Sequence, residues 1–571
     1  MLVAALALAA AFDITTAANT SDHARTGRLS ELRVVCDRLT TIQQGCDVFG
    51  TSPEGRPMHA YTLSSIPAPK RAANAAFRTR PTVLVIGGIH AGEIDGKDAS
   101  IAVLKRLVDG DLTGVLEHVT VVFVPVYNVD GHERFGKNNR PNQRGPEEMG
   151  WRTTSQNLNL NRDWAKADAP ETRAMLALIE RVDPVVIMDL HVTDGAKFQH
   201  DIAVMVEPWH DDGSDTPLIE PALTLQRGLI ADLTATGHLP LPFYPSFERD
   251  DDPASGFAVG VVPARLTHGY AARRGRVGVL VETHSWHPYK ARVQATVDVV
   301  AGFLRRAQTD AASWRRAADE SDRLRASLVG KPVALAFDND PASTTTIDFL
   351  GYAYAIAPSD VSGAPWIRYD ETTPQTWRVP LVRDVTATRT VTAPLRYVVL
   401  PGFAPAVAAV LRAHGVRFTV VEKAYEEPAQ RFVAADVTFS TTPYEGRQTA
   451  KFKGAWQPRA MAPVPVGSLS VPVAQPRGRL VVELLEPSAR ESLAAWGFMN
   501  ARFEQKEYME AYVAEDVARA QLKDPAVRAA FDEKLKDPAF AKDPAARLDF
   551  FYRRHASYDV EHNVLPVLRI E

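Results

Sequence analysis

The stretch Thr82–Glu93, TVLVIGGIHAGE, decides the fold, because an apolar run of strand length ends there in a short polar turn. Its opening part, TVLVIGG, predicts a strand buried on both faces, since such strands are continuous apolar runs rather than alternating ones. Three later runs have the same character, at Val119–Val126, Val185–Leu190 and Val277–Glu282. The four runs therefore predict strands of one sheet.

Helical patterns separate these strands. Between Glu93 and Val108 the apolar residues Ile101, Leu104 and Val108 recur on one helical face, and Gly110 ends the pattern. Buried strands that alternate with helices indicate an α/β fold in which helices cover both faces of the sheet. In such sheets, functional side chains collect at the carboxyl ends of the strands.

The chain divides into three parts after its first residues. The α/β pattern occupies residues 25–328 and ends in a helical stretch from about Gln294 to Leu328. Residues 330–485 contain many short strand-like runs, and 397–421 predict a strand–helix–strand unit. Residues 486–571 are predicted to be helical. We therefore expect a C-terminal α+β accessory region, and the absence of a long linker predicts that it packs on the α/β domain.

Composition narrows the possible classes of protein. The 571 residues carry a formal net charge of −4, with 45% hydrophobic and 23% charged residues, which is ordinary for a globular protein. This near-neutral balance gives no reason to expect nucleic acid or an anionic membrane surface as a partner. No run after the N-terminus approaches the roughly 20 apolar residues of a membrane span.

The N-terminus predicts export. Residues Leu2 to Phe12 form an apolar run followed by small and polar residues, which is typical of a signal peptide, here within residues 1–20. The basic residues that usually begin such a peptide are missing, so a buried helix is the alternative. The two cysteines, Cys36 and Cys46, fit a disulfide in an exported protein, with two buried thiols as the alternative. We therefore expect a secreted or periplasmic protein.

Polar side chains stand where the predicted strands end. His90 follows the first strand, His191 follows the third and Glu282 closes the fourth, while Glu93 follows His90 after a glycine that allows a tight turn. Catalytic zinc uses three protein ligands and leaves one position open, so His90, Glu93 and His191 predict one zinc ion per chain. Five other histidines are weaker candidates than His191, which an apolar run delivers to a strand end: His132, His200, His268, His284 and His287.

Several short segments extend this constellation over residues 28–300. In order, they are Gly87–Glu93, Asn128–Gly131, Trp151–Arg152, Asn159–Arg162, His191 and Glu282–Ser285. Together they resemble the zinc carboxypeptidase family of carboxypeptidase A type, and the sequences of several segments are closest to those of bacterial members with a long C-terminal extension. The resemblance implies a mixed, mostly parallel sheet and a zinc-dependent metallocarboxypeptidase that removes C-terminal residues from peptides.

The resemblance also implies roles for further residues. Glu282 matches the glutamate that acts as general base on water and later protonates the leaving amine. Arg152 matches the arginine that binds the scissile carbonyl and stabilises the oxyanion. Asn161 and Arg162 match the pair that binds the terminal carboxylate of the substrate, which a planar guanidinium can hold with two parallel hydrogen bonds. The implied partner is therefore a peptide with a free C-terminal carboxylate.

Two positions depart from the family's pattern. Asn159 stands where pancreatic-type members carry an aspartate that supports a ligand histidine, which keeps an acceptor but removes a charge. The mobile active-site tyrosine has no secure match, and Tyr270 is assigned instead, with Thr267 and His268, to the pocket that binds the substrate side chain. Two other functions stay open, a zinc amidohydrolase or deacylase of the aspartoacylase type and a non-catalytic peptidase-like binding protein. The complete ligand set and Glu282 argue against the second.

Overall fold

The computed structural model describes residues 14–193, 195–212 and 216–571. Residues 1–13, which contain most of the predicted signal peptide, lie outside the described residues, so the signal peptide stays a prediction. Within the described ranges, no helix combines the length and the apolar character needed to cross a membrane.

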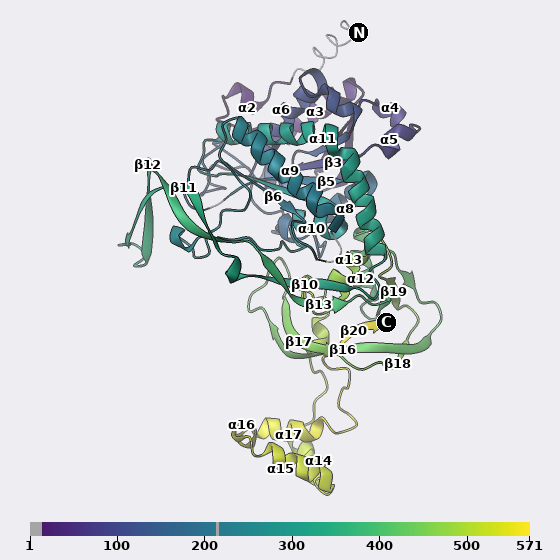
Figure 1. Cartoon of the computed structure of the whole chain (residues 1–571). Coiled ribbons are helices and arrows are strands. Elements are labelled where there is room, and N and C mark those ends of the chain that lie inside the picture. Colours follow the sequence, from purple (N-terminus) through teal and green to yellow (C-terminus); the bar gives the residue numbers. More distant parts are fainter. Residues whose placement is uncertain (1–13, 194, 213–215) are drawn as a thin grey trace.

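One mixed sheet of eight strands forms the centre of the N-terminal domain, in the order β1-β2-β4-β3-β5-β9-β6-β7 (Figure 1). β4, β3, β5 and β9 run parallel, whereas the pairs β1–β2, β2–β4 and β6–β9 are antiparallel. The four predicted strands are β3, β4, β5 and β9, and the expected mixed, mostly parallel sheet is confirmed. The strands are β1 Gly45–Thr51, β2 Pro57–Leu63, β3 Thr82–Gly87, β4 Thr120–Val124, β5 Val186–Val192, β6 Ile202–Glu207, β7 Pro240–Leu241 and β9 Val277–Thr283.

Helices cover the sheet, and every residue of β4, β5 and β9 is buried. Helix α11 contacts α6 and α9, and all three contact strands of the sheet, while α10 contacts β5, β6 and β9. The helix expected after the first strand is α6, and the long helix that closes the domain is α11. The helices are α2 Ala17–Thr20, α3 Leu29–Thr41, α4 Ala68–Arg71, α5 Ala75–Thr79, α6 Asp95–Asp109, α7 Val129–Glu133, α8 Pro170–Val182, α9 Thr216–Ala235, α10 Thr267–Arg274 and α11 Tyr289–Ala326.

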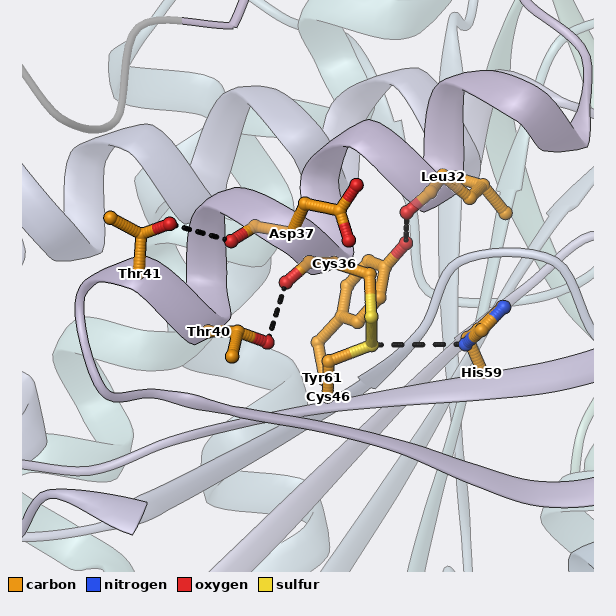
Figure 2. The surroundings of a disulfide bond; sticks show 8 residues. All are labelled: Leu32, Cys36, Asp37, Thr40, Thr41, Cys46, His59 and Tyr61. Carbon is orange, nitrogen blue, oxygen red and sulfur yellow. Dashed lines mark hydrogen bonds between the residues drawn. A yellow bond between two sulfur atoms is a disulfide. The ribbon is translucent and has the colours of Figure 1, made fainter. Parts of the chain in front are cut away.

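A disulfide joins Cys36 on α3 to Cys46 on the edge strand β1, with 5.4 Å between the two Cα atoms. Figure 2 shows that His59 on β2 approaches this bridge, its Nδ1 lying 3.7 Å from Cys46 Sγ. Next to it, the Tyr61 hydroxyl donates to the Leu32 carbonyl oxygen at 2.7 Å. Of the two alternatives for the cysteines, the structure therefore has the disulfide, which ties α3 to the sheet.

Residues 330–571 form a β-rich region that packs on the α/β domain. One continuous apolar cluster contains Val85 of the central sheet together with Tyr397 and Leu480 of this region. The largest sheet of this C-terminal region has the order β15-β19-β14-β20-β16-β17, with β18 paired to β16. The expected strand–helix–strand unit is β14, α12 and β15, although β19 lies between the two strands. The elements are β14 Arg396–Val399, α12 Ala404–Ala413, β15 Thr419–Val420, β16 Tyr425–Phe439, β17 Ala450–Trp456, β18 Ala460–Val464, β19 Leu469–Pro472, α13 Gly478–Leu485 and β20 Val564–Ile570.

Two smaller sheets connect this region to the α/β domain. β10 (Pro332–Asn339) pairs with β13 (Val385–Thr392), and β11 (Thr345–Pro358) pairs with β12 (Pro365–Val382) in a long ribbon that projects from the body (Figure 1). The end of β12 pairs in parallel with β8 (Phe257–Ala258) of the α/β domain.

The expectation that residues 486–571 are helical is only partly correct. Helices α14 to α17 gather around Phe531, Phe550 and Phe551 and project from the body (Figure 1). They are α14 Ala511–Gln521, α15 Pro525–Lys534, α16 Pro538–Lys542 and α17 Pro544–Tyr552. The chain then returns as β20, which lies between β14 and β16. Such a short apolar run becomes a strand because distant partners complete its hydrogen bonds, which local periodicity does not reveal.

Candidate active site

The carboxyl ends of three neighbouring parallel strands bring the predicted metal ligands and general base together. His191 on β5 and Glu282 on β9 are directly paired residues of adjacent strands. His90 and Glu93 lie in the turn between β3 and α6, where the Glu93 N–H donates to the His90 carbonyl oxygen at 2.9 Å. A Cβ at Gly92 would lie 2.7 Å from a backbone carbonyl oxygen, so this tight turn has room only for glycine.

The side chains of His90, Glu93 and His191 converge and are buried. Nδ1 of His90 lies 3.0 Å from Glu93 Oε1, and Nδ1 of His191 lies 3.0 Å from Glu93 Oε2. One possible ligand atom from each residue lies within 4.8 Å of the other two. Among the described residues, the other grouping of this kind contains the two bridged cysteines, whose sulfur atoms are already used.

The outer nitrogen of each histidine is held by an oxygen acceptor. Nε2 of His90 lies 3.0 Å from Asn159 Oδ1, and Nε2 of His191 lies 2.8 Å from Asp189 Oδ2. An Nε2–H that donates outward leaves a lone pair on Nδ1, which faces the Glu93 carboxylate. With its Nε2–H directed outward, each ring can offer a Nδ1 lone pair beside the Glu93 carboxylate, so this donor set fits a divalent cation.

The charges around the triad set its protonation. Burial lowers the pKa of His90 to about 4. Burial also disfavours the charged form of His191, but the Asp189 carboxylate raises the pKa of His191 well above its usual value. For Glu93, burial acts to raise the pKa, and the neighbouring His90 and Arg140 outweigh it and hold the pKa well below the usual range. Glu93 is therefore ionised, as a candidate metal ligand has to be.

A cavity of about 420 Å³ lies beside the triad. Arg152, Asn161, Arg162 and Glu282 line it together with the three ligands, so the structure gathers these predicted residues at one place. Arg152 Nη1 lies 3.3 Å from Glu93 Oε1, and Arg162 Nη1 donates to the Asn161 carbonyl oxygen at 2.8 Å. Much of the remaining wall is apolar, with contributions from Met205, Val206, Trp209, Val261, Leu266 and Leu280.

This geometry can be compared with known proteins. Residues 38–201 match the zinc carboxypeptidase family. The resemblance drawn from the sequence motifs is thereby confirmed. The matched residues include the three candidate ligands, Arg152 and Arg162, whereas Glu282 lies beyond them. No curated protein matches the chain.

Solved metallo-carboxypeptidases are among the similar structures. The one from Burkholderia cenocepacia has 18% sequence identity and a TM-score of 0.35, with 47% of this chain and 65% of that one covered. The one from Pseudomonas aeruginosa, in complex with (2-guanidinoethylmercapto)succinic acid, has 16% identity and a TM-score of 0.35, covering 48% of this chain and 68% of that one. Carboxypeptidase A from Helicoverpa armigera has 15% identity and a TM-score of 0.36, covering 55% and 78%.

Tyr270 does not reach the cavity of this zinc carboxypeptidase-like domain. Its ring is buried, stacks on Trp164 with 5.3 Å between ring centroids, and places its hydroxyl 3.0 Å from Nδ1 of His414 in the C-terminal region. His268, two residues earlier on α10, does line the cavity. Residues two apart on a helix point in different directions, which is why the helix presents the histidine to the cavity and the tyrosine to the core.

Four residues near the cavity were missed from the sequence. Arg140 Nη2 lies 2.8 Å from Glu93 Oε1, and Asp189 holds His191 as described. Glu207 on β6 is a buried wall residue whose pKa burial raises to about 7, and Arg383 enters from the C-terminal region just after β12. Alternation along β5 could have revealed Asp189, which shares a face with His191, but no local signal links the other three to the site.

Proposed function

We propose that the chain is a zinc-dependent metallocarboxypeptidase that hydrolyses the last peptide bond of peptides with a free C-terminal carboxylate. The observation that carries this proposal is the convergence of a His–Glu–His triad with Glu282 and two arginines around one cavity. The family match supports a metallopeptidase, and the cavity residues support the finer assignment. Two imidazoles and one carboxylate are the ligand set of a catalytic zinc site with one open position.

His90, Glu93 and His191 would hold the metal. Zinc at such a site supplies a Lewis acid and makes water acidic enough to react near neutral pH. Asn159 and Asp189 keep the imidazole rings oriented toward Glu93 through their bonds to the Nε2 atoms. The ligand set is thus built into the fold before any substrate binds.

The remaining cavity residues account for hydrolysis. The Glu282 carboxylate takes one proton from the attacking water, whose oxygen bonds to the carbonyl carbon, and returns the proton to the amine nitrogen as the C–N bond breaks. Arg152 presents a fixed positive charge to the oxygen that becomes negative. Arg162, with Asn161 beside it, pairs with the terminal carboxylate of the substrate. The apolar part of the wall is suited to the side chain of the last residue.

Export belongs to the same proposal. The Cys36–Cys46 disulfide supports a protein that works outside the cytoplasm, since disulfides persist in oxidising compartments. The predicted signal peptide points the same way.

One assay on the purified full chain tests the proposed function. A peptide with a free C-terminus should be cleaved, and the same peptide with an amidated C-terminus should not, because the neutral amide leaves the Arg162 cation unpaired. Glu282→Gln should reduce kcat roughly 10²-fold or more while zinc content stays at one per chain, because only the proton acceptor is lost. Equal cleavage of both peptides would contradict exopeptidase action, and release of an N-acyl group alone would favour the amidohydrolase alternative.

A further inference from the structure

The C-terminal region reaches the segment that carries the proposed carboxylate-binding residues. The accessory loop, defined as residues 440–449 between β16 and β17, contacts the segment 157–168 of the α/β domain. Glu445 Oε2 accepts a hydrogen bond from the backbone N–H of Asn159 at 2.8 Å. Arg447 donates two bonds of 2.6 Å to the two carboxylate oxygens of Asp168. Glu445 and Asn159, which are 286 residues apart in sequence, thus meet beside the candidate active site.

Two aromatic side chains from a later part of the chain, Trp496 and Phe498, contact the accessory loop. The Tyr444 ring stacks on Trp496, with 5.9 Å between centroids and 16° between planes. The Arg447 guanidinium carbon lies 3.6 Å from the centroid of the Phe498 ring. Glu445 itself adopts a φ of 51°, in a region that side-chain-bearing residues rarely occupy. Such a conformation persists only where surrounding contacts determine it, and it is enriched at functional sites.

Asn159 is the residue through which this contact can act. Its side-chain Oδ1 lies 3.0 Å from Nε2 of the ligand His90 and accepts the backbone N–H of Asn161 at 2.9 Å. Its carbonyl oxygen accepts the backbone N–H of Arg162 at 2.9 Å. The buried residue Asn159 therefore connects the candidate metal-ligand side of the cavity with the proposed carboxylate-binding side. Its backbone N–H donates to Glu445.

We propose that Glu445 is a positioning residue that fixes Asn159, and through it orients both His90 and the Asn161–Arg162 pair. This inference rests on the proposed function for its substrate-binding half. It gives the C-terminal region a role inside the active site, because the α/β domain alone would leave the Asn159 N–H without this acceptor. A shift of one ångström at a binding residue can change turnover 10²-fold, and loss of an outer partner weakens metal binding 10- to 100-fold.

The test compares Glu445→Ala and Glu445→Gln in the full-length protein. Alanine and glutamine both carry a Cβ, so the backbone conformation costs each of them about as much as it costs glutamate. Alanine removes the acceptor, whereas glutamine keeps a neutral oxygen in its place. We expect Glu445→Ala to lower zinc affinity about 10-fold, measured by chelator competition, and to raise KM for a free-carboxylate peptide about 10-fold. Glu445→Gln should restore most of both.

A matched control lies elsewhere in the same region. Glu427 pairs with Arg396 inside the C-terminal region, so Glu427→Ala removes a carboxylate without touching the segment 157–168. Its zinc affinity and KM should equal those of the wild type. Should Glu445→Ala fail to fold, Glu445→Asp keeps the charge but withdraws it by one methylene, and should show a smaller loss of the same kind.

The outcomes separate this inference from the proposed function. Wild-type zinc affinity and KM in Glu445→Ala would overturn the positioning role, as would equal losses in Glu427→Ala. If the wild type cleaves no peptide but Glu445→Ala still loses zinc affinity, the proposed function fails while the positioning of His90 through Asn159 stands.

Discussion

Asn159 and Asp189, the outer partners of the two candidate ligand histidines, differ in charge. This difference predicts that they contribute unequally to zinc affinity. Asp189 is fully buried, and its Oδ2 lies 2.8 Å from Nε2 of His191. Asp189→Asn keeps the shape and an acceptor oxygen but removes the negative charge. Outer partners of this kind change metal affinity 10- to 100-fold, which corresponds to about 1.4–2.7 kcal/mol.

The opposite substitution can be made at Asn159, the outer partner of the other histidine, His90. Asn159→Asp adds a carboxylate 3.0 Å from Nε2 of His90 without changing the side-chain shape, so zinc affinity should rise about 10-fold. The double variant Asp189→Asn with Asn159→Asp should fall between the two single variants. Chelator competition on the purified proteins measures all three, and circular dichroism confirms that the fold is kept.

The proton balance defines the conditions of this assay. Asp189 raises the pKa of His191, so at low pH zinc must displace a proton from that ring. The loss caused by Asp189→Asn should therefore be largest at the alkaline end of the range, where proton competition is weakest. Unchanged zinc affinity there, with the fold intact, would refute the reasoning that outer charge strengthens the ligand.

Two further predictions concern stability. Replacing Cys36 and Cys46 by serine should lower the free energy of unfolding by about 2–3 kcal/mol, because the bridge closes a loop with a sequence separation of 10, and a thermal melt with and without reductant will measure it. His238 lies between Asp201 and Asp298, which raise its pKa to about 9. A raised pKa stabilises the fold fully below about pH 6.5 and loses that effect as pH rises through 9. His238→Gln should therefore lower the free energy of unfolding by about 1 kcal/mol at pH 6, after solvent screening, and by almost nothing at pH 10. The melting temperatures of the variant and the wild type at the two pH values measure this difference. A deficit that stays constant between them would contradict the prediction.

The core of the α/β domain could be predicted because its signals are local. Four apolar runs of strand length became β3, β4, β5 and β9, since a strand covered on both faces needs no polar alternation. The positions of His90 and His191 followed from the same runs, because parallel strands end at one edge of the sheet. The glycine turn before Glu93 was also local, as Gly92 has no room for a side chain.

The sequence alone therefore determined the four central strands of the sheet, the three candidate ligands and the candidate base, since each depends on a residue's place along a single strand or turn. Tertiary structure alone decided that α10 turns Tyr270 toward His414, that β20 returns to the accessory sheet, and that Glu445 reaches Asn159. These contacts join residues far apart in the chain. Their geometry depends on how whole elements pack against one another, and no short window of sequence contains that information.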